Sequence, residues 1–206
     1  MKQRVLACVA VWVLLVGPHT QTKHHPKPVK HPAPKVSACV TETLAAAAGT
    51  TCTRGGVTFT YSSDPYAATG AGAPGPSSIA IVMDSNGSNA TLVGNQSNFT
   101  GGWSVGPGQM WSFTIRYTVQ GTTGKFSLAQ LGAAATGDGS VVAKQTAGTV
   151  MSSITCTATA PCATPSSGNY TSYTPATAPQ DVGVTLTLNG GTNGTASISQ
   201  LSQHWQ

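Results

Sequence analysis

The sequence predicts an all-β fold: a single antiparallel β-sandwich, Ig-like or jelly-roll-like, with about nine strands and one short helical turn near the start of the domain. The first observation is a segment whose apolar residues occupy every second position: Trp111, Phe113, Ile115, Tyr117 and Val119. This period indicates a strand with one buried and one solvated face. The second is composition, with 24 glycines and 7% charged residues, against roughly 25% charged in ordinary soluble domains. Short strands joined by many turns suit such a chain.

The other elements follow from alternating patterns and turn signals. Glu42–Ala48 is expected to be the helical turn, stopped by Gly49. In the last strand the alternation slips between Ile198 and Leu201, which indicates a bulge. Segment 154–165 is interpreted as a clipped hairpin or edge loop. Strands are expected at 57–61, 79–83, 90–93, 103–105, 110–120, 126–131, 141–146, 182–188 and 195–205.

Residues 1–22 are typical of a secretory signal peptide. Lys2 and Arg4 precede an apolar run of 13 residues, Val5–Gly17. This run is shorter than the roughly 20 residues that a membrane-spanning helix needs. We therefore expect a secreted, extracellular protein that does not span a membrane once it is processed.

Residues 23–36 form a Lys/His/Pro-rich segment that we interpret as a flexible arm, because proline favours extended structure and prevents helix. It is either a solvated spacer or a contact with an anionic cell-surface polymer through Lys23, Lys27, Lys30 and Lys35. A loose divalent-metal site is a weaker alternative, through His24, His25 and His31. Nothing nearby supplies the fixed geometry of a structural metal site, so we predict no metal and no cofactor.

The basic character of the chain lies outside the domain. The formal net charge is +5, but from Val36 onward four basic residues stand against five acidic ones. A basic domain face for nucleic acid is therefore not expected.

Residues 37–206 form the predicted sandwich domain, and its four cysteines favour disulfides in an exported chain. Three pairings are possible. We favour the sequence neighbours, Cys39 with Cys52 and Cys156 with Cys162, each of which would close a local loop.

Aromatic residues supply the candidate ligand contacts. Trp111 and Tyr117 share the apolar face of the central strand, so we assign them to the core, and Trp103 as well. Aromatics in loops or near the chain end are better placed for contact: Tyr66, Tyr170, Tyr173 and Trp205. Trp205 could instead cap the core. No GxSxG elbow, HExxH motif or phosphate loop is present, so we predict no enzyme and no catalytic residues.

From Ala38 onward the order of features resembles a largely uncharacterised group of exported bacterial proteins, many of which carry a PEP-CTERM sorting tail. The resemblance lies in ACVTETLAAAAGTTCTRGGVTFTY, GWSVGPGQMWSFTIRYTV and NGGTNGTASISQLSQ. It implies an extracellular β-sandwich with small disulfide loops, and it brings no catalytic residues. The tail's proline–glutamate motif, apolar helix and basic end are absent, so we expect release from the cell rather than anchoring.

The sequence therefore predicts a secreted, non-enzymatic structural or adhesive surface or matrix protein. The alternative is a carbohydrate- or cell-wall-binding module that uses exposed aromatics and takes a polysaccharide as partner. Aromatics aligned on one wet sheet face would favour the alternative, and the sequence offers only scattered ones.

Overall fold

The computed structural model describes residues 35–36, 39, 42–54, 56–83, 89–94, 102–160, 171–174 and 177–206. These belong to one unit, Ala33–Gln206. The expected signal peptide lies outside the described residues, as do all the arm's candidate contacts except Lys35. Within the part of the chain that is described, no helix is both long and apolar enough to cross a membrane.

A seven-stranded sheet forms one layer, with β8 (Met110–Gln120) at its centre. On one side of β8 lie β4 (Val57–Thr69), β3 (Thr50–Arg54) and β1 (Lys35–Val36). On the other side lie β14 (Gln180–Asn189), β11 (Ser140–Ala147) and β12 (Val150–Thr157). Every pair is antiparallel except β1 with β3. Because β1 is Lys35–Val36, the sheet includes two residues that we placed in the arm.

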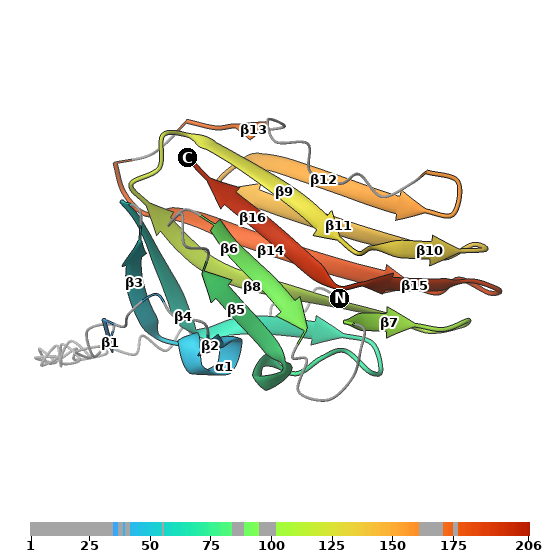
Figure 1. Cartoon of the computed structure of the whole chain (residues 1–206). Helices are drawn as coiled ribbons and strands as arrows, with labels where there is room; N and C mark the ends of the chain where they lie inside the picture. The colour runs from blue at the N-terminus through green and yellow to red at the C-terminus, as the bar shows by residue number, and fades with distance from the viewer. Residues whose placement is uncertain are drawn as a thin grey trace, which may run out of the picture. The chain divides into compact units, whose positions relative to one another are not determined.

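A six-stranded sheet forms the second layer, and a three-stranded sheet completes the fold. The six-stranded order is β13 (Thr171–Ser172), β9 (Lys125–Leu131), β16 (Gln200–Trp205), β6 (Asn89–Gly94), β5 (Ile79–Met83) and β2 (Glu42–Thr43). The three-stranded order is β10 (Ala134–Thr136), β15 (Thr195–Ile198) and β7 (Trp103–Val105). Figure 1 shows β5, β6, β16 and β9 lying across the seven-stranded sheet. The expected antiparallel β-sandwich is confirmed.

Alternation along the strands builds one core between the sheets. The apolar residues of β8 from Trp111 to Val119 are buried, and those between them are half-buried or exposed. Trp205 of β16 meets this face, since its ring centre lies 6.5 Å from that of Tyr117 on β8. Burying each such side chain stabilises the fold by roughly 1.5–3 kcal/mol. The core assignments of Trp103, Trp111 and Tyr117 are confirmed.

The structure has more strands than expected: sixteen among the described residues, against about nine. Several of the additional ones, such as β2 and β13, span two residues, which is too short for a period-two pattern to show. The edge strand β12 covers part of the segment 154–165 that we interpreted as a clipped hairpin or edge loop. The largely polar composition of β12 gives only a weak alternating pattern, so the sequence did not predict this strand. In place of the single bulged strand predicted for 195–205, the chain bends at Ser199, leaving β15 in one sheet and entering β16 in another.

The helical turn is shorter than predicted. The helix α1 covers Leu44–Ala47, because Glu42 and Thr43 pair with β5 instead. The Thr43 hydroxyl accepts a hydrogen bond from the Ala46 N–H at 3.2 Å and so caps the helix. Gly49 has a φ of +74°, which suits the stop assigned to it. A single 3-10 turn, Pro76–Ser78, precedes β5.

Cys39 and Cys52 form a disulfide with a Cα–Cα distance of 5.2 Å, which confirms the first predicted pairing. Cys156 is also disulfide-bonded. Cys162 lies outside the described residues, so its pairing with Cys156 stays a prediction.

The Asp138 carboxylate ties together the turns beside β11 and β14. Its two oxygens accept hydrogen bonds from the backbone N–H groups of Thr192, at 2.7 Å, and Asn193, at 2.9 Å. These two bonds hold the pKa of Asp138 below its usual value, because they favour the ionised form.

Candidate functional site

The outer face of the seven-stranded sheet carries the polar half of the alternating pattern. On β8 this half consists of Ser112, Thr114, Arg116 and Thr118. Strand pairing places Arg116 opposite Gly183 on β14, and Gly183 opposite Thr146 on β11. A row of outward positions therefore crosses three adjacent strands.

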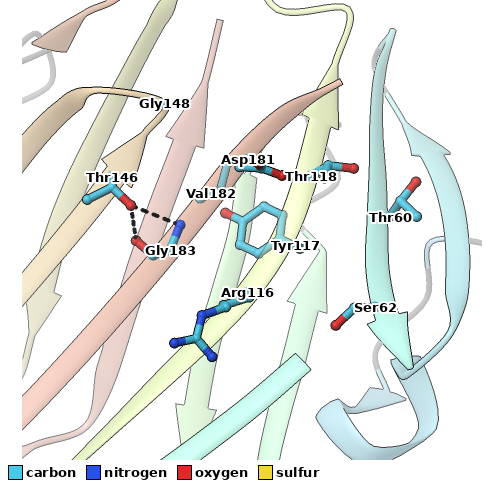
Figure 2. Close-up of a pocket in the computed structure, with 10 residues that line it drawn as sticks. All are labelled: Thr60, Ser62, Arg116, Tyr117, Thr118, Thr146, Gly148, Asp181, Val182 and Gly183. Carbon is cyan, nitrogen blue, oxygen red and sulfur yellow. Dashed lines mark hydrogen bonds between the residues drawn. The ribbon is translucent and has the colours of Figure 1, made fainter. Parts of the chain in front are cut away.

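A pocket of about 570 Å³ lies on this face. That volume falls within the roughly 300–1,000 Å³ of small-molecule sites. Its walls come from four neighbouring strands, β4, β8, β14 and β11 (Figure 2). The side chains that give it polar character are Thr60, Ser62, Arg116, Thr118, Thr146 and Asp181.

An irregularity in β4 shapes one side of the pocket. Tyr61 pairs with Tyr117 but Tyr66 pairs with Ile115, so β4 gains residues between these points and bulges opposite Arg116. Pro65 lies in this bulge, where its missing N–H removes no regular sheet hydrogen bond. Regular pairing is interrupted where Ser62 lines the pocket.

Gly183 shapes the other side. Its backbone N–H donates to the Thr146 hydroxyl at 3.1 Å, and that hydroxyl donates to the Gly183 carbonyl at 3.3 Å (Figure 2). A Cβ at position 183 would lie 2.9 Å from Thr146 Oγ1, too close for the present arrangement. Glycine therefore keeps this part of the sheet face open and lets Thr146 approach the backbone.

Arg116 and Asp181 are the charged groups of the pocket. Both are exposed, and neither side chain forms a hydrogen bond or ion pair with any residue that the structure describes. Asp181 pairs in register with Thr118, which is the next outward-facing pair after Arg116–Gly183. Such diagonal positions are about 7–8 Å apart. The pocket thus offers a guanidinium donor, a carboxylate acceptor and several hydroxyls that can do either.

The aromatic candidates from the sequence do not form this site. Trp205 and Tyr173 are buried, which corrects their assignment as ligand contacts and agrees with the alternative that Trp205 belongs to the core. Both pack on Phe126, with ring centres 5.4 Å and 5.9 Å from it, respectively. Tyr66 is half-buried, its hydroxyl donates to the Pro74 carbonyl, and burial raises its pKa.

Tyr170, His24, His25 and His31 lie outside the described residues, and so do Lys23, Lys27 and Lys30. Lys35 begins β1. Searched over the described ranges alone, the chain brings together no cluster of three or more His, Cys, Asp or Glu residues that could hold a metal ion.

Sequence reasoning missed Arg116, Asp181 and Thr146 as site residues. Two signals point to this part of the sheet. Arg116 is the one charged residue among the wet positions of the strand 110–120, and Gly183 interrupts an otherwise β-branched and aliphatic strand. A glycine inside a strand often marks a close approach of backbone or ligand. Neither signal says that the two residues lie on neighbouring strands.

Comparisons with known proteins assign this chain to no family. No protein-family model and no curated protein matches it. A solved structure of TmCBM61 in complex with beta-1,4-galactotriose is similar to it, with 11% sequence identity and a TM-score of 0.36. The similarity covers 69% of this chain and 89% of that chain.

Proposed function

We propose that this chain is a secreted carbohydrate-binding module without catalytic activity, whose ligand lies in the pocket on the outer face of the seven-stranded sheet. The observation that carries the proposal is a pair of charges, Arg116 and Asp181, that has no partner among the described residues and lies beside several strand hydroxyls. Sugar hydroxyls both donate and accept hydrogen bonds, so a site that offers both kinds of group suits them.

The strands under the pocket and the fixed Thr146 hydroxyl support binding. Its polar side chains project from strands rather than from loops, and Thr146 is fixed by two hydrogen bonds to Gly183. Groups that are held in place before a ligand arrives lose less conformational entropy when it binds. The pocket differs from the site expected from sequence, because it binds by hydrogen bonds instead of by stacking on exposed aromatics.

The composition of the pocket favours binding over hydrolysis. Asp181 is the one carboxylate among its lining residues. Glycoside hydrolysis ordinarily needs two carboxyl groups on opposite sides of the scissile bond. The structural or adhesive interpretation assigned no ligand site to the domain, so the pocket favours the carbohydrate-binding alternative.

Calorimetric titration with soluble oligosaccharides tests the proposal. The panel should include beta-1,4-galactotriose together with cello-, xylo- and chito-oligosaccharides. We expect at least one to bind, and Arg116→Gln to weaken binding about tenfold or more, because hydrogen bonds to charged groups are the stronger ones. Lys125→Gln is the matched control, since it removes one exposed positive charge from β9 in the other sheet.

Two results would contradict carbohydrate binding in the pocket. One is the absence of binding across the panel by wild-type protein. The other is an equal loss of affinity in Arg116→Gln and Lys125→Gln, which would make the effect one of net charge. Reducing-sugar release during the titration would contradict the absence of catalysis.

The arm stays a second predicted contact, with an anionic cell-surface polymer. Retention on such a polymer should fall with salt, since exposed charges are screened. It should also fall in the triple variant Lys23→Gln, Lys27→Gln, Lys30→Gln. Binding in the pocket should be unaffected by that variant.

A further inference from the structure

Three glutamine side chains lie in the core between the seven-stranded and six-stranded sheets. Gln130 on β9, Gln145 on β11 and Gln203 on β16 are each at most 1% exposed. Each takes an inward position of its strand, as Gln145 does between the buried Ala143 and Ala147. Glutamine is mostly found at the surface, and a buried amide is ordinarily hydrogen-bonded. These three side chains therefore need partners inside the core.

The hydrogen bonds of the three amides are incomplete. Gln130 Nε2 donates to the backbone carbonyls of Val141, at 3.5 Å, and Ile154, at 3.3 Å. Gln203 Oε1 accepts from the Tyr117 hydroxyl at 2.8 Å. The other four amide atoms are buried and have no hydrogen-bond partner among the described residues: Gln130 Oε1, Gln145 Oε1, Gln145 Nε2 and Gln203 Nε2. A buried amide group without a partner destabilises the fold, because it was hydrogen-bonded to water in the unfolded chain.

The unpaired groups face one region of the core. β9 lies against β11 and β12, and Gln130 and Gln203 are diagonal neighbours on β9 and β16, about 7–8 Å apart. Gln145 has an alanine at the inward position on either side of it, and the half-buried Ser152 stands opposite it on the edge strand β12. The small side chains leave room beside the Gln145 amide. The unpaired atoms are thus close to one another without being in direct contact.

Water is the partner whose chemistry fits this set of atoms. The set contains both N–H donors and carbonyl acceptors, and a water molecule serves either kind. A buried water ordinarily makes about three hydrogen bonds to polar groups that would otherwise lack a partner. The three amides carry no charge, so they offer nothing to balance an ion.

We propose that ordered water molecules bind in the core between β11 and the β9–β16 pair, where they bridge Gln130, Gln145 and Gln203. This hydration site does not depend on the proposed function. It does lie behind the pocket, because Gln145 precedes the pocket residue Thr146 and the two side chains point to opposite faces of β11. Water bound to Gln145 therefore helps to hold the strand on which the pocket residue stands.

Water–protein NOE spectroscopy on the whole protein tests the site, with the side-chain amide protons of Gln145 and Gln203 as probes. We expect cross peaks at the water frequency whose signs are opposite in NOE and ROE spectra. Opposite signs identify water held inside the protein, since surface water and chemical exchange each give equal signs in the two spectra. Tyr117→Phe and Ser152→Ala remove hydroxyls beside these amides, whose exchanging protons would imitate bound water. The cross peaks should persist in both variants.

Thermal unfolding of Gln145→Met gives a second readout. Methionine keeps the length of the side chain and removes both unpaired atoms. A water-mediated hydrogen bond is nearly as favourable as a direct one, so loss of the bridge should lower the melting temperature by about 2–4 °C. If the amide were dry and unpaired, the same substitution would raise the melting temperature. Leu128→Met is the matched control, because it places methionine opposite Gln203 without changing a polar group, and it should keep both cross peaks.

Three results would overturn the water site. The first is the absence of opposite-sign cross peaks at both glutamines in the wild type. The second is their loss in Tyr117→Phe and Ser152→Ala, which would assign them to exchanging hydroxyl protons. The third is a melting temperature of Gln145→Met above that of the wild type. None of these results bears on oligosaccharide binding in the pocket, which calorimetry tests separately.

Discussion

The two faces of the seven-stranded sheet are made by the same strands, yet they differ in composition and in solvent exposure. The inner face of β8 and β14 is aromatic and aliphatic and is buried. The outer face carries mostly threonine, serine and glycine, and it is half-buried or exposed. Neighbours in sequence thus serve different purposes: inner residues stabilise the fold, and outer residues are available to a ligand.

This difference explains why aromatic residues were misleading as site candidates. In a chain with 6% aromatic residues, the sandwich uses most of the described ones to fill the space between its sheets. Trp205 and Tyr173 are examples, since both pack on Phe126. The polar groups that remain lie on the outer face, where we propose that the ligand binds. The following substitutions test this division of roles, in order of their expected effect on stability.

The largest effect should come from an inner position of β8. Phe113→Ala removes a ring that is 1% exposed and that meets Trp103 and Trp111 at 5.3 Å and 5.9 Å between ring centres. We expect a loss of about 3–5 kcal/mol in the free energy of unfolding, measured by urea denaturation. The adjacent outer variant Thr114→Ala should lose less than about 1 kcal/mol. Equal losses at the two positions would contradict the division between the faces.

An intermediate effect should follow removal of a single buried oxygen from the same inner face. The Tyr117 hydroxyl donates to Gln203 Oε1 at 2.8 Å, and burial raises its pKa well above the usual value. Tyr117→Phe leaves the buried Gln203 carbonyl without this donor, at a cost of about 1–3 kcal/mol. Thermal unfolding would measure the loss. An unchanged melting temperature would show that this hydrogen bond contributes nothing net.

A smaller effect is expected at Asp138, an exposed side chain that acts structurally through backbone hydrogen bonds. Since its pKa is lowered in the folded protein, its stabilisation is present above the unfolded pKa of about 3.9. It is lost as the pH falls through the lower folded pKa. Asp138→Asn should therefore melt below wild type at pH 7, and the gap should close in strong acid. A gap that stays constant with pH would exclude the ionised carboxylate as its cause.

The smallest effect on stability is expected at Gly183 on the outer face. Gly183→Ala gains strand propensity but places a Cβ near Thr146 Oγ1, so the net change should stay within about 1 kcal/mol. The pocket floor is filled by the new methyl group, and oligosaccharide affinity should fall although the melting temperature does not. Calorimetry and thermal unfolding on the same sample would separate the two effects. A stable variant with full affinity would place the ligand elsewhere.

The sequence by itself determined the local features of this protein. Alternation from Trp111 to Val119 assigned each residue of β8 to the inner or outer face, because side chains in a strand point to opposite sides in turn. A helical turn within Glu42–Ala48 and the Cys39–Cys52 loop also follow from short-range signals. Each involves residues close in sequence, so composition and spacing suffice.

Only the tertiary structure decided which strands are neighbours. Trp103–Val105 precedes β8 in sequence but pairs with β15, and β8 itself pairs with β4 and β14. The pocket depends on this choice, since it needs Gly183 beside Arg116 on one side and the β4 bulge beside Arg116 on the other. Periodicity fixes the face of each strand but carries no information on its partner or register. Those are set by the joint packing of both sheets over distant parts of the chain, and the candidate site exists only once that packing is complete.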